Sequence, residues 1–296
     1  MHPLLPYFCL LFNAMVWGLA WWPFQTMHAQ GLVAPWATGM IYSLLAVGTV
    51  LIFRDSLRQL LAHPVLWLLA LSSGLTNVSF NTAASTGDVV RVILLFYLMP
   101  AWAVLLAWKF LGERPSTQSL LRLLLAFGGM ALVIVPQGAT WHSLTHGVGL
   151  PEYLALLGGL CFAMSNVILR RSFHAPATAR MLAMFIGCMV IGLSSAATGY
   201  ATGHLPAIPA PNLVWVACAL GMAVLVAIAT WAWQYGASRI PTSTTSLIML
   251  SEVLFATGSA WLLGATQLTP RMLLGGALIV AGALLAALQG RRSAAA

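Results

Sequence analysis

The sequence predicts an all-α integral membrane protein in which ten transmembrane helices form two inverted five-helix repeats. Three observations support this fold class: a high hydropathy, regularly spaced long apolar runs, and an uneven distribution of basic residues. The 296 residues are 60% apolar and only 6% charged, and the mean hydropathy is +0.92. An ordinary soluble domain is about a quarter charged, so this chain has too few charged side chains to cover a surface exposed to water.

The net charge of the chain needs no nucleic-acid partner. The formal charge is +8 and the pI is about 10.0, but nucleic-acid binding requires Lys and Arg clustered on one face, and here they are scattered. The hydropathy also excludes a disordered chain. The four cysteines lie in apolar runs without a C-x-x-C pair, so they predict neither a disulfide framework nor a zinc site.

The chain contains ten apolar runs that are long enough to cross a bilayer, which takes about 20 residues. They are joined by short connections and leave no room for a soluble domain. The runs are 4–27, 35–53, 64–84, 90–110, 119–136, 150–169, 180–201, 212–236, 242–263 and 271–289. No basic flank or small-residue cleavage site accompanies the first run, so we expect it to be a retained span.

The basic residues predict the orientation of these spans, because Lys and Arg accumulate on the cytoplasmic side. With the N-terminus inside, the outer side keeps only Arg91 and Arg271. The other basic residues fall on the inner side: Arg54, Arg58, Lys109, Arg114, Arg122, Arg170, Arg171, Arg180, Arg239, Arg291 and Arg292. We therefore expect a multi-pass protein of a bacterial inner membrane with both termini in the cytoplasm.

The two halves of the chain resemble each other weakly. A shift of 152 residues places Leu111 and Gly112 on Leu263 and Gly264, so a long apolar helix ends in Leu-Gly in both halves. Five spans per copy is an odd number, which means that the copies have opposite orientations in the membrane. Inverted repeats are typical of transporters whose substrate site lies between the halves. The expected repeats span residues 1–136 and 150–289.

Three motifs resemble the drug/metabolite transporter superfamily, whose members carry EamA-type repeats. They are Asn13-x-x-x-Trp17-Gly18, the run Arg91-Val-Ile-Leu-Leu-Phe-Tyr-Leu-Met-Pro100, and Phe110-Leu-Gly-Glu113-Arg-Pro-Ser. The resemblance covers essentially the whole chain, and the second motif is most similar to YddG-type exporters of aromatic amino acids. It implies an inner-membrane carrier with ten helices. Its central cavity would be lined by helices one to four and six to nine, with the fifth and tenth at the periphery.

The chain departs from the superfamily pattern at one position. The Gly-Glu that ends the fourth span at Glu113 is replaced by Gly264-Ala265 in the second copy. A role for Glu113 therefore cannot be symmetric in this chain.

Glu252 lies about midway along the ninth span, where an ionisable side chain is a functional candidate by default. Thr242, Thr245 and Met249 share one helical face with it. One interpretation is that Glu252 contacts the ammonium group of a substrate or couples transport to protons. The other is that it stays protonated and forms a hydrogen bond between helices.

Polar and aromatic side chains mark other candidate faces. Asn77 and Asn81 lie one turn apart in the third span and face either a water-filled cavity or another helix; we expect the cavity. Trp17 is too deep for the interfacial aromatic belt, so it is either core packing or a stacking surface for an aromatic ligand. The expected substrate-binding residues are Trp17, Asn77, Asn81, Tyr97, Trp231, Tyr235, Met249 and Glu252.

A carrier fits these features better than the other classes of membrane protein. An intramembrane enzyme is disfavoured because no His lies in a span core and G-x-S-x-G and H-E-x-x-H are absent. No ring of charge or filter-like loop suggests a channel, and a scaffold would not need polar stripes. We expect no catalytic residue and no cofactor. We also expect no metal site, because His142 and His146 lack further ligands.

The leading substrates are aromatic amino acids, exported down their gradient by alternating access. Other neutral amino acids or drug-like cations, with or without proton coupling, remain the alternative. The sequence leaves the oligomeric state open.

Overall fold

The computed structural model describes residues 4–86, 89–135, 138, 140, 149–264 and 269–295, and every regular element in this part of the chain is a helix. The first half contains α1 (Leu5–Leu19), α2 (Trp21–Ala29), α3 (Ala34–Ile52), α4 (Ser56–Leu61), α5 (Val65–Thr86), α6 (Val89–Phe96), α7 (Met99–Leu111) and α8 (Thr117–Ile134). The second half contains α10 (Leu150–Arg171), α11 (Ala177–Ala201), α12 (Leu213–Ala237), α13 (Thr242–Met249), α14 (Glu252–Leu262) and α15 (Pro270–Ala295).

Helices cover all ten apolar runs of the sequence. Among the described residues, eight helical stretches are long and apolar enough to cross a membrane. The 22-residue α5 is outside this set, because Ser, Thr and Asn side chains interrupt its apolar sequence. The apolar stretch recognised in α15 is shorter, Pro270–Leu285. The structure thus confirms an all-helical, multi-pass architecture, while the count of ten spans stays a prediction.

The fourth and ninth expected spans are each broken near the middle. Proline at the start of a helix has no N–H to donate and prevents the preceding helix from continuing. Pro100 accordingly lies in the first turn of α7, and the Leu98 N–H bonds to the Leu95 carbonyl, three residues back rather than four. The break between α13 and α14 has no proline. There Ser251 donates from its backbone N–H and from its hydroxyl to the Ile248 carbonyl oxygen, at 3.0 and 2.7 Å.

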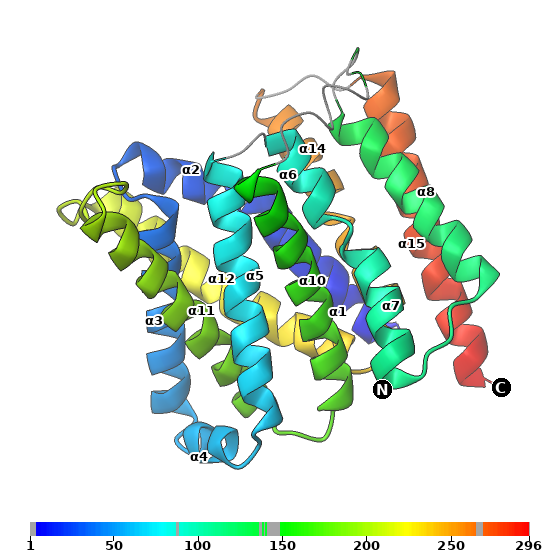
Figure 1. The fold of residues 1–296 in the computed structure, drawn as a ribbon, viewed down its shortest axis with the longest axis horizontal. Helices are drawn as coiled ribbons and strands as arrows, with labels where there is room; N and C mark the ends of the chain where they lie inside the picture. The colour runs from blue at the N-terminus through cyan, green and yellow to red at the C-terminus, as the bar shows by residue number, and fades with distance from the viewer. Residues whose placement is uncertain are drawn as a thin grey trace.

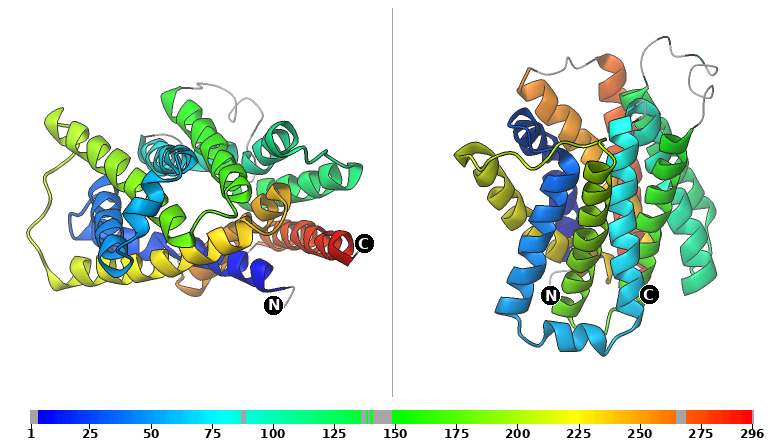
Figure 2. Two further views of the ribbon diagram at one scale, coloured as in Figure 1. Left: turned by 90° about the horizontal axis from the view of Figure 1, so that it is seen from below. Right: turned by 60° about the vertical axis from the view of Figure 1, so that its left-hand side comes forward.

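The bundle has two distinct ends (Figure 1). The N- and C-termini lie toward the end that carries α4, and we call this the termini end. The opposite end carries α2 and α14, and we call it the far end. The second view in Figure 2 shows the same arrangement, with both termini toward the end that holds α4.

Helices from the two halves pack against each other throughout the bundle. The helix α5 packs between α10 and α11, α3 packs on α11, and α1 packs on α12. The helices α8 and α15 pair at one edge (Figure 1), in agreement with the peripheral position implied for them. They meet at Gly129 and Gly275, where a Cβ added to either glycine would stand 2.5 Å from the carbonyl oxygen of the other. Only glycine allows two helices to come so close.

Candidate functional site

A cavity of about 600 Å³ lies between the two halves. Asn13, Trp233 and Met249 line it near the middle of the bundle, and Phe24 and Thr257 line it closer to the far end. It therefore extends from the middle of the bundle toward the far end. Its size is typical of pockets that hold a small molecule.

Aromatic side chains from both halves form a continuous wall of this cavity. The rings of Phe80 and Phe96 have centroids 4.6 Å apart, and Phe96 lies 5.7 Å from Tyr97 and 6.4 Å from Phe162. Phe162 in turn stacks on Trp233 at 5.2 Å, with an angle of 13° between the planes. These distances are in the range in which aromatic rings attract each other, so the wall is well packed and offers ring faces to a ligand.

Trp233 is held in place by hydrogen bonds that cross the bundle. Its indole Nε1 donates to Asn166 Oδ1 at 3.1 Å, and the Asn166 amide donates to Ser246 Oγ at 3.4 Å. Asn166 is fully buried, so this network satisfies an amide that would otherwise be costly within a membrane. The network links α10, α12 and α13 behind the aromatic wall.

Glu252 is the charged residue of this cavity: no other side chain among the described lining residues carries a charge. It is the first residue of α14, where the helix dipole favours a negative charge. The Tyr97 hydroxyl forms a hydrogen bond with its carboxyl group. The two breaks in α6–α7 and α13–α14 thus bring together one side chain from each half.

Amide side chains supply the remaining polar surface of the cavity. Asn77 Nδ2 lies 3.4 Å from Cys188 Sγ, and Asn81 Nδ2 donates to Thr38 Oγ1 at 3.3 Å. Asn13 Nδ2 lies 3.6 Å from Met249 Sδ, and its Oδ1 atom is buried without a hydrogen-bond partner. Asn77 also forms a hydrogen bond with the Tyr42 hydroxyl. Sulfur is a weak acceptor, so the Asn13 amide has donor capacity left for a ligand.

The structure places six of the eight expected binding residues on this cavity: Trp17, Asn77, Asn81, Tyr97, Met249 and Glu252. Trp231 and Tyr235 lie elsewhere. Trp231 is 49% exposed on the outside of α12, and its ring stacks on that of Tyr235 at 5.8 Å. The Arg239 guanidinium lies over the Tyr235 ring, 3.7 Å from its centroid. Two residues further along a helix is more than half a turn, so Trp233 faces the cavity while Trp231 faces away.

Sequence reasoning missed Trp233 and the phenylalanines of the wall. Trp231 and Trp233 are both aromatic, and periodicity alone does not say which of them faces inward. One residue in the sequence could have pointed to Trp233. Asn166 is an amide within an apolar run, and such an amide needs a hydrogen-bond partner from another helix. The His142–His146 pair lies outside the described residues, and the described residues contain no cluster of three metal-ligating side chains.

Comparisons with known proteins agree with the fold. The model of the EamA-like transporter family matches the chain twice, at residues 4–135 and 150–288. An uncharacterized transporter of Archaeoglobus fulgidus is 28% identical over 223 residues, which are 74% of each chain. A solved crystal structure superposes with a TM-score of 0.77 over 97% of this chain and 98% of its own, at 18% identity, and this likeness shows the fold alone.

These matches cover nearly the whole chain in two copies. The chain therefore belongs to the EamA-like transporter family, and it transports small molecules across a membrane.

Proposed function

We propose that this transporter carries small amphipathic molecules that combine an aromatic body with an amine, with aromatic amino acids as the leading substrates. The observation that supports the proposal most is the composition of the central cavity. Aromatic rings form its wall, and Glu252 is the one charged side chain among the described lining residues. An aromatic body would stack on the wall, and an ammonium group would pair with the Glu252 carboxylate.

The amides that line the cavity favour an amino acid over a simple amine. Asn13 has donor capacity that its sulfur partner uses only weakly, and the amides of Asn77 and Asn81 also line the cavity. A substrate carboxylate would accept hydrogen bonds from such amides. No basic side chain is present among the described lining residues, so this end of the substrate would be bound by neutral donors.

We further propose that the two family matches form inverted repeats, and that export proceeds by alternating access without proton coupling. Both repeats contribute to the cavity, as expected of a site between inverted repeats. Glu252 is hydrogen-bonded to Tyr97 and has no basic partner among the described lining residues. A carboxyl without a neighbouring cation or second acid gives little support to a proton relay.

Transport in proteoliposomes tests the proposal. Counterflow of radiolabelled tryptophan would be measured for wild type, Trp17→Ala and the matched control Trp231→Ala, whose ring lies outside the cavity. Loss of a stacking ring costs about 0.5–1.5 kcal/mol, so Trp17→Ala should weaken tryptophan transport by up to about tenfold, and the control should resemble wild type. Equal transport by all three proteins, or equal losses in both variants, would contradict the site.

Glu252→Gln and a set of competitors distinguish the substrate classes. An ammonium that pairs with Glu252 loses a charged hydrogen bond of about 1.5–3 kcal/mol, so the variant should transport poorly with or without a pH gradient. Competition by phenylalanine but not by phenethylamine would support an amino-acid substrate, and the reverse would favour amphipathic cations. Wild-type transport that rises several-fold with the pH gradient, and a variant that ignores the gradient, would overturn export without proton coupling.

A further inference from the structure

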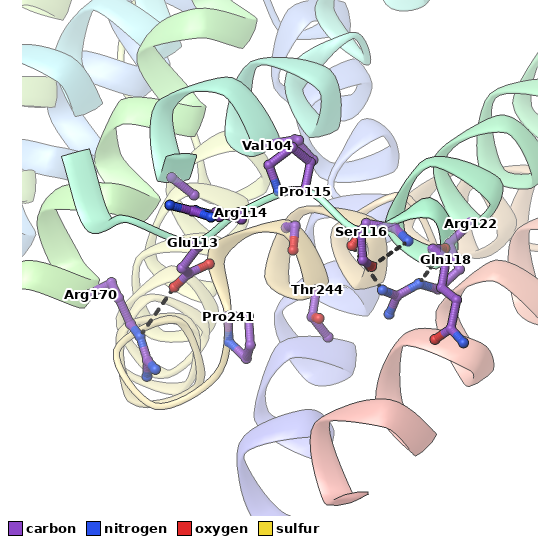
Figure 3. A pocket seen from close by; sticks show the side chains of 13 residues that line it. Val104, Glu113, Arg114, Pro115, Ser116, Gln118, Arg122, Arg170, Pro241 and Thr244 are labelled. Carbon is purple, nitrogen blue, oxygen red and sulfur yellow. Dashed lines mark hydrogen bonds and ion pairs between the residues drawn. The ribbon is translucent and has the colours of Figure 1, made fainter. Parts of the chain in front are cut away.

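A second pocket of about 640 Å³ lies at the termini end, away from the central cavity. It is formed where the C-terminal ends of α7 and α10 meet the N-terminal ends of α8 and α13 (Figure 3). Its lining is polar, whereas the central cavity is aromatic. No residue lines both pockets, so the proposed transport function does not account for this one.

The charges around this pocket are mostly positive. Arg114, Arg122 and Arg170 all line it, against the single carboxylate of Glu113. That carboxylate is already engaged: it lies 3.9 Å from Arg170 Nε and accepts a hydrogen bond from the Thr242 backbone N–H. Burial also raises the pKa of Glu113 above its ordinary value. The pocket therefore keeps an excess of positive charge that no described residue neutralises.

Of the three arginines, Arg122 gives the strongest evidence that the pocket lacks an anion. Its side chain is only 7% exposed, and its hydrogen bonds go to neutral groups of its own helix, the Gln118 carbonyl at 3.0 Å and Ser119 Oγ at 2.9 Å. No carboxylate of a described residue lies within ion-pair distance of it. A buried cation is costly unless an anion pairs with it, so the pocket lacks a negative partner at this position.

Thr244 supplies an independent observation. It lines the pocket and is only 4% exposed, so it is a buried hydroxyl-bearing residue of the pocket wall. It belongs to the first turn of α13, and the pocket also receives the first turn of α8. Helix N-termini present backbone N–H groups and a partial positive charge, which suits a phosphate group.

The surroundings of the pocket place it at the level of lipid headgroups. Large apolar side chains beside it are exposed, as expected of a surface that faces lipid chains: Trp108, Leu120, Leu121 and Leu124. The distribution of basic residues predicts that the termini end is cytoplasmic. Basic pockets between transmembrane helices on that side suit anionic lipid headgroups.

We propose that this pocket binds a phosphate or phosphodiester group, carried either by an anionic phospholipid or by free phosphate. The guanidinium groups of Arg114 and Arg122 would bind the phosphate oxygens, since Arg matches phosphate geometry with two parallel hydrogen bonds. The Thr244 hydroxyl would donate a further hydrogen bond. A phosphate bound here would contact both halves of the transporter at once, because α8 belongs to the first and α13 to the second.

Native mass spectrometry of the purified full-length protein in detergent tests this site. Retention of phosphatidylglycerol would be compared with that of zwitterionic phosphatidylcholine for wild type, Arg122→Gln, Arg114→Gln and Arg58→Gln. The last variant removes the same charge from exposed α4 at the same end and is the matched control. Wild type and Arg58→Gln should retain phosphatidylglycerol in preference to phosphatidylcholine. Arg122→Gln should lose about tenfold in apparent affinity, and Arg114→Gln should lose less.

A second measurement separates the two sources of the phosphate. Inorganic phosphate that raises the melting temperature of wild type, and not that of Arg114→Gln, would show that free phosphate serves as a ligand; an effect of the lipid alone would assign the site to a headgroup. If Arg122→Gln fails to fold, Arg114→Gln decides, because its side chain is exposed. Equal retention of both lipids, or equal affinities in Arg114→Gln and Arg58→Gln, would overturn the proposal.

Discussion

The half of the bundle toward the far end and the half toward the termini end differ in how their buried polar side chains are hydrogen-bonded. The far half surrounds much of the cavity. There Asn81 donates a hydrogen bond to Thr38, and Trp21 Nε1 donates to Ser259 Oγ at 3.0 Å. The central cavity does not extend into the termini half, which we call the closed half for that reason. Several buried polar atoms of the closed half have no hydrogen-bond partner among the described residues. These belong to Ser56, Ser172, Arg180, Gln234, Thr242 and Thr245.

In the closed half, the cost of buried polar groups without partners is opposed by the packing of the helices. A buried polar group without a partner costs about 1–3 kcal/mol, so packing must compensate for each of these side chains. Tight helix crossings provide that packing. If the termini half opened during transport, water would reach the same side chains and satisfy them. The polar groups therefore favour opening and the close packing favours closure, which is the balance that the proposed alternating access would need.

The largest expected effect concerns the packing of the closed half. Gly187 of α11 lies against the Ala70 carbonyl of α5, and a Cβ added there would overlap that carbonyl group. Gly187→Val should therefore force α5 and α11 apart and destabilise the protein by several kcal/mol, beyond the usual 1–3 kcal/mol of overpacking. Thermal unfolding in detergent measures this effect. Gly221→Val is the control, since nothing lies within 4 Å of its added Cβ. Similar melting temperatures for the two variants would disprove the tight crossing.

A smaller effect is expected from removing one unpartnered polar group. Gln234 is 1% exposed, and neither Oε1 nor Nε2 has a partner. Gln234→Met keeps much of the volume and removes both polar atoms, so it should stabilise the closed half by about 1–3 kcal/mol and slow transport. Melting temperature and flux would be measured on the same preparations. A variant that is less stable than wild type would show that the Gln234 amide is satisfied in the closed protein.

The smallest effect is a pH dependence of stability through Glu113. Burial raises the pKa of this carboxyl in the folded protein, so the folded state binds its proton more tightly than the unfolded state does. Stability must then fall as pH rises through the interval between the ordinary pKa of glutamate and the raised value. Glu113→Gln removes the titration. The melting temperature of the variant minus that of wild type should increase from pH 4.5 to pH 7, and a decrease would contradict this sign.

Local patterns in the sequence predicted much of the fold. Pro100 is a local signal for the break in the fourth span, because a proline disrupts its own helix wherever that helix packs. Leu111-Gly112 and Leu263-Gly264 predicted matching helix ends, and both glycines adopt a positive φ of 72°. The break before Glu252 had no such signal. It depends on a hydroxyl that bonds back to the preceding turn, and serines do so only in some helices.

The candidate site was harder to predict than the fold. Asn77, Asn81 and Glu252 were found because an amide or a carboxyl in a membrane needs a polar environment, and the cavity is the place that offers one. Trp231 was chosen over Trp233 because it shares a helical face with the polar side chains of Gln234, Tyr235 and Ser238. A choice between them requires knowledge of the neighbouring helices.

The sequence by itself determined that this chain is a helical membrane transporter with two related halves, because hydropathy and helix signals are properties of consecutive residues. The tertiary structure decided which face of each helix lines the cavity, which half the cavity does not enter, and that Arg122 and Thr244 line one pocket. The physical reason is that lipid chains and a protein interior are equally apolar. Hydropathy therefore shows that a helix lies in the membrane, and only the packing of its neighbours shows which side faces lipid and which faces the substrate path.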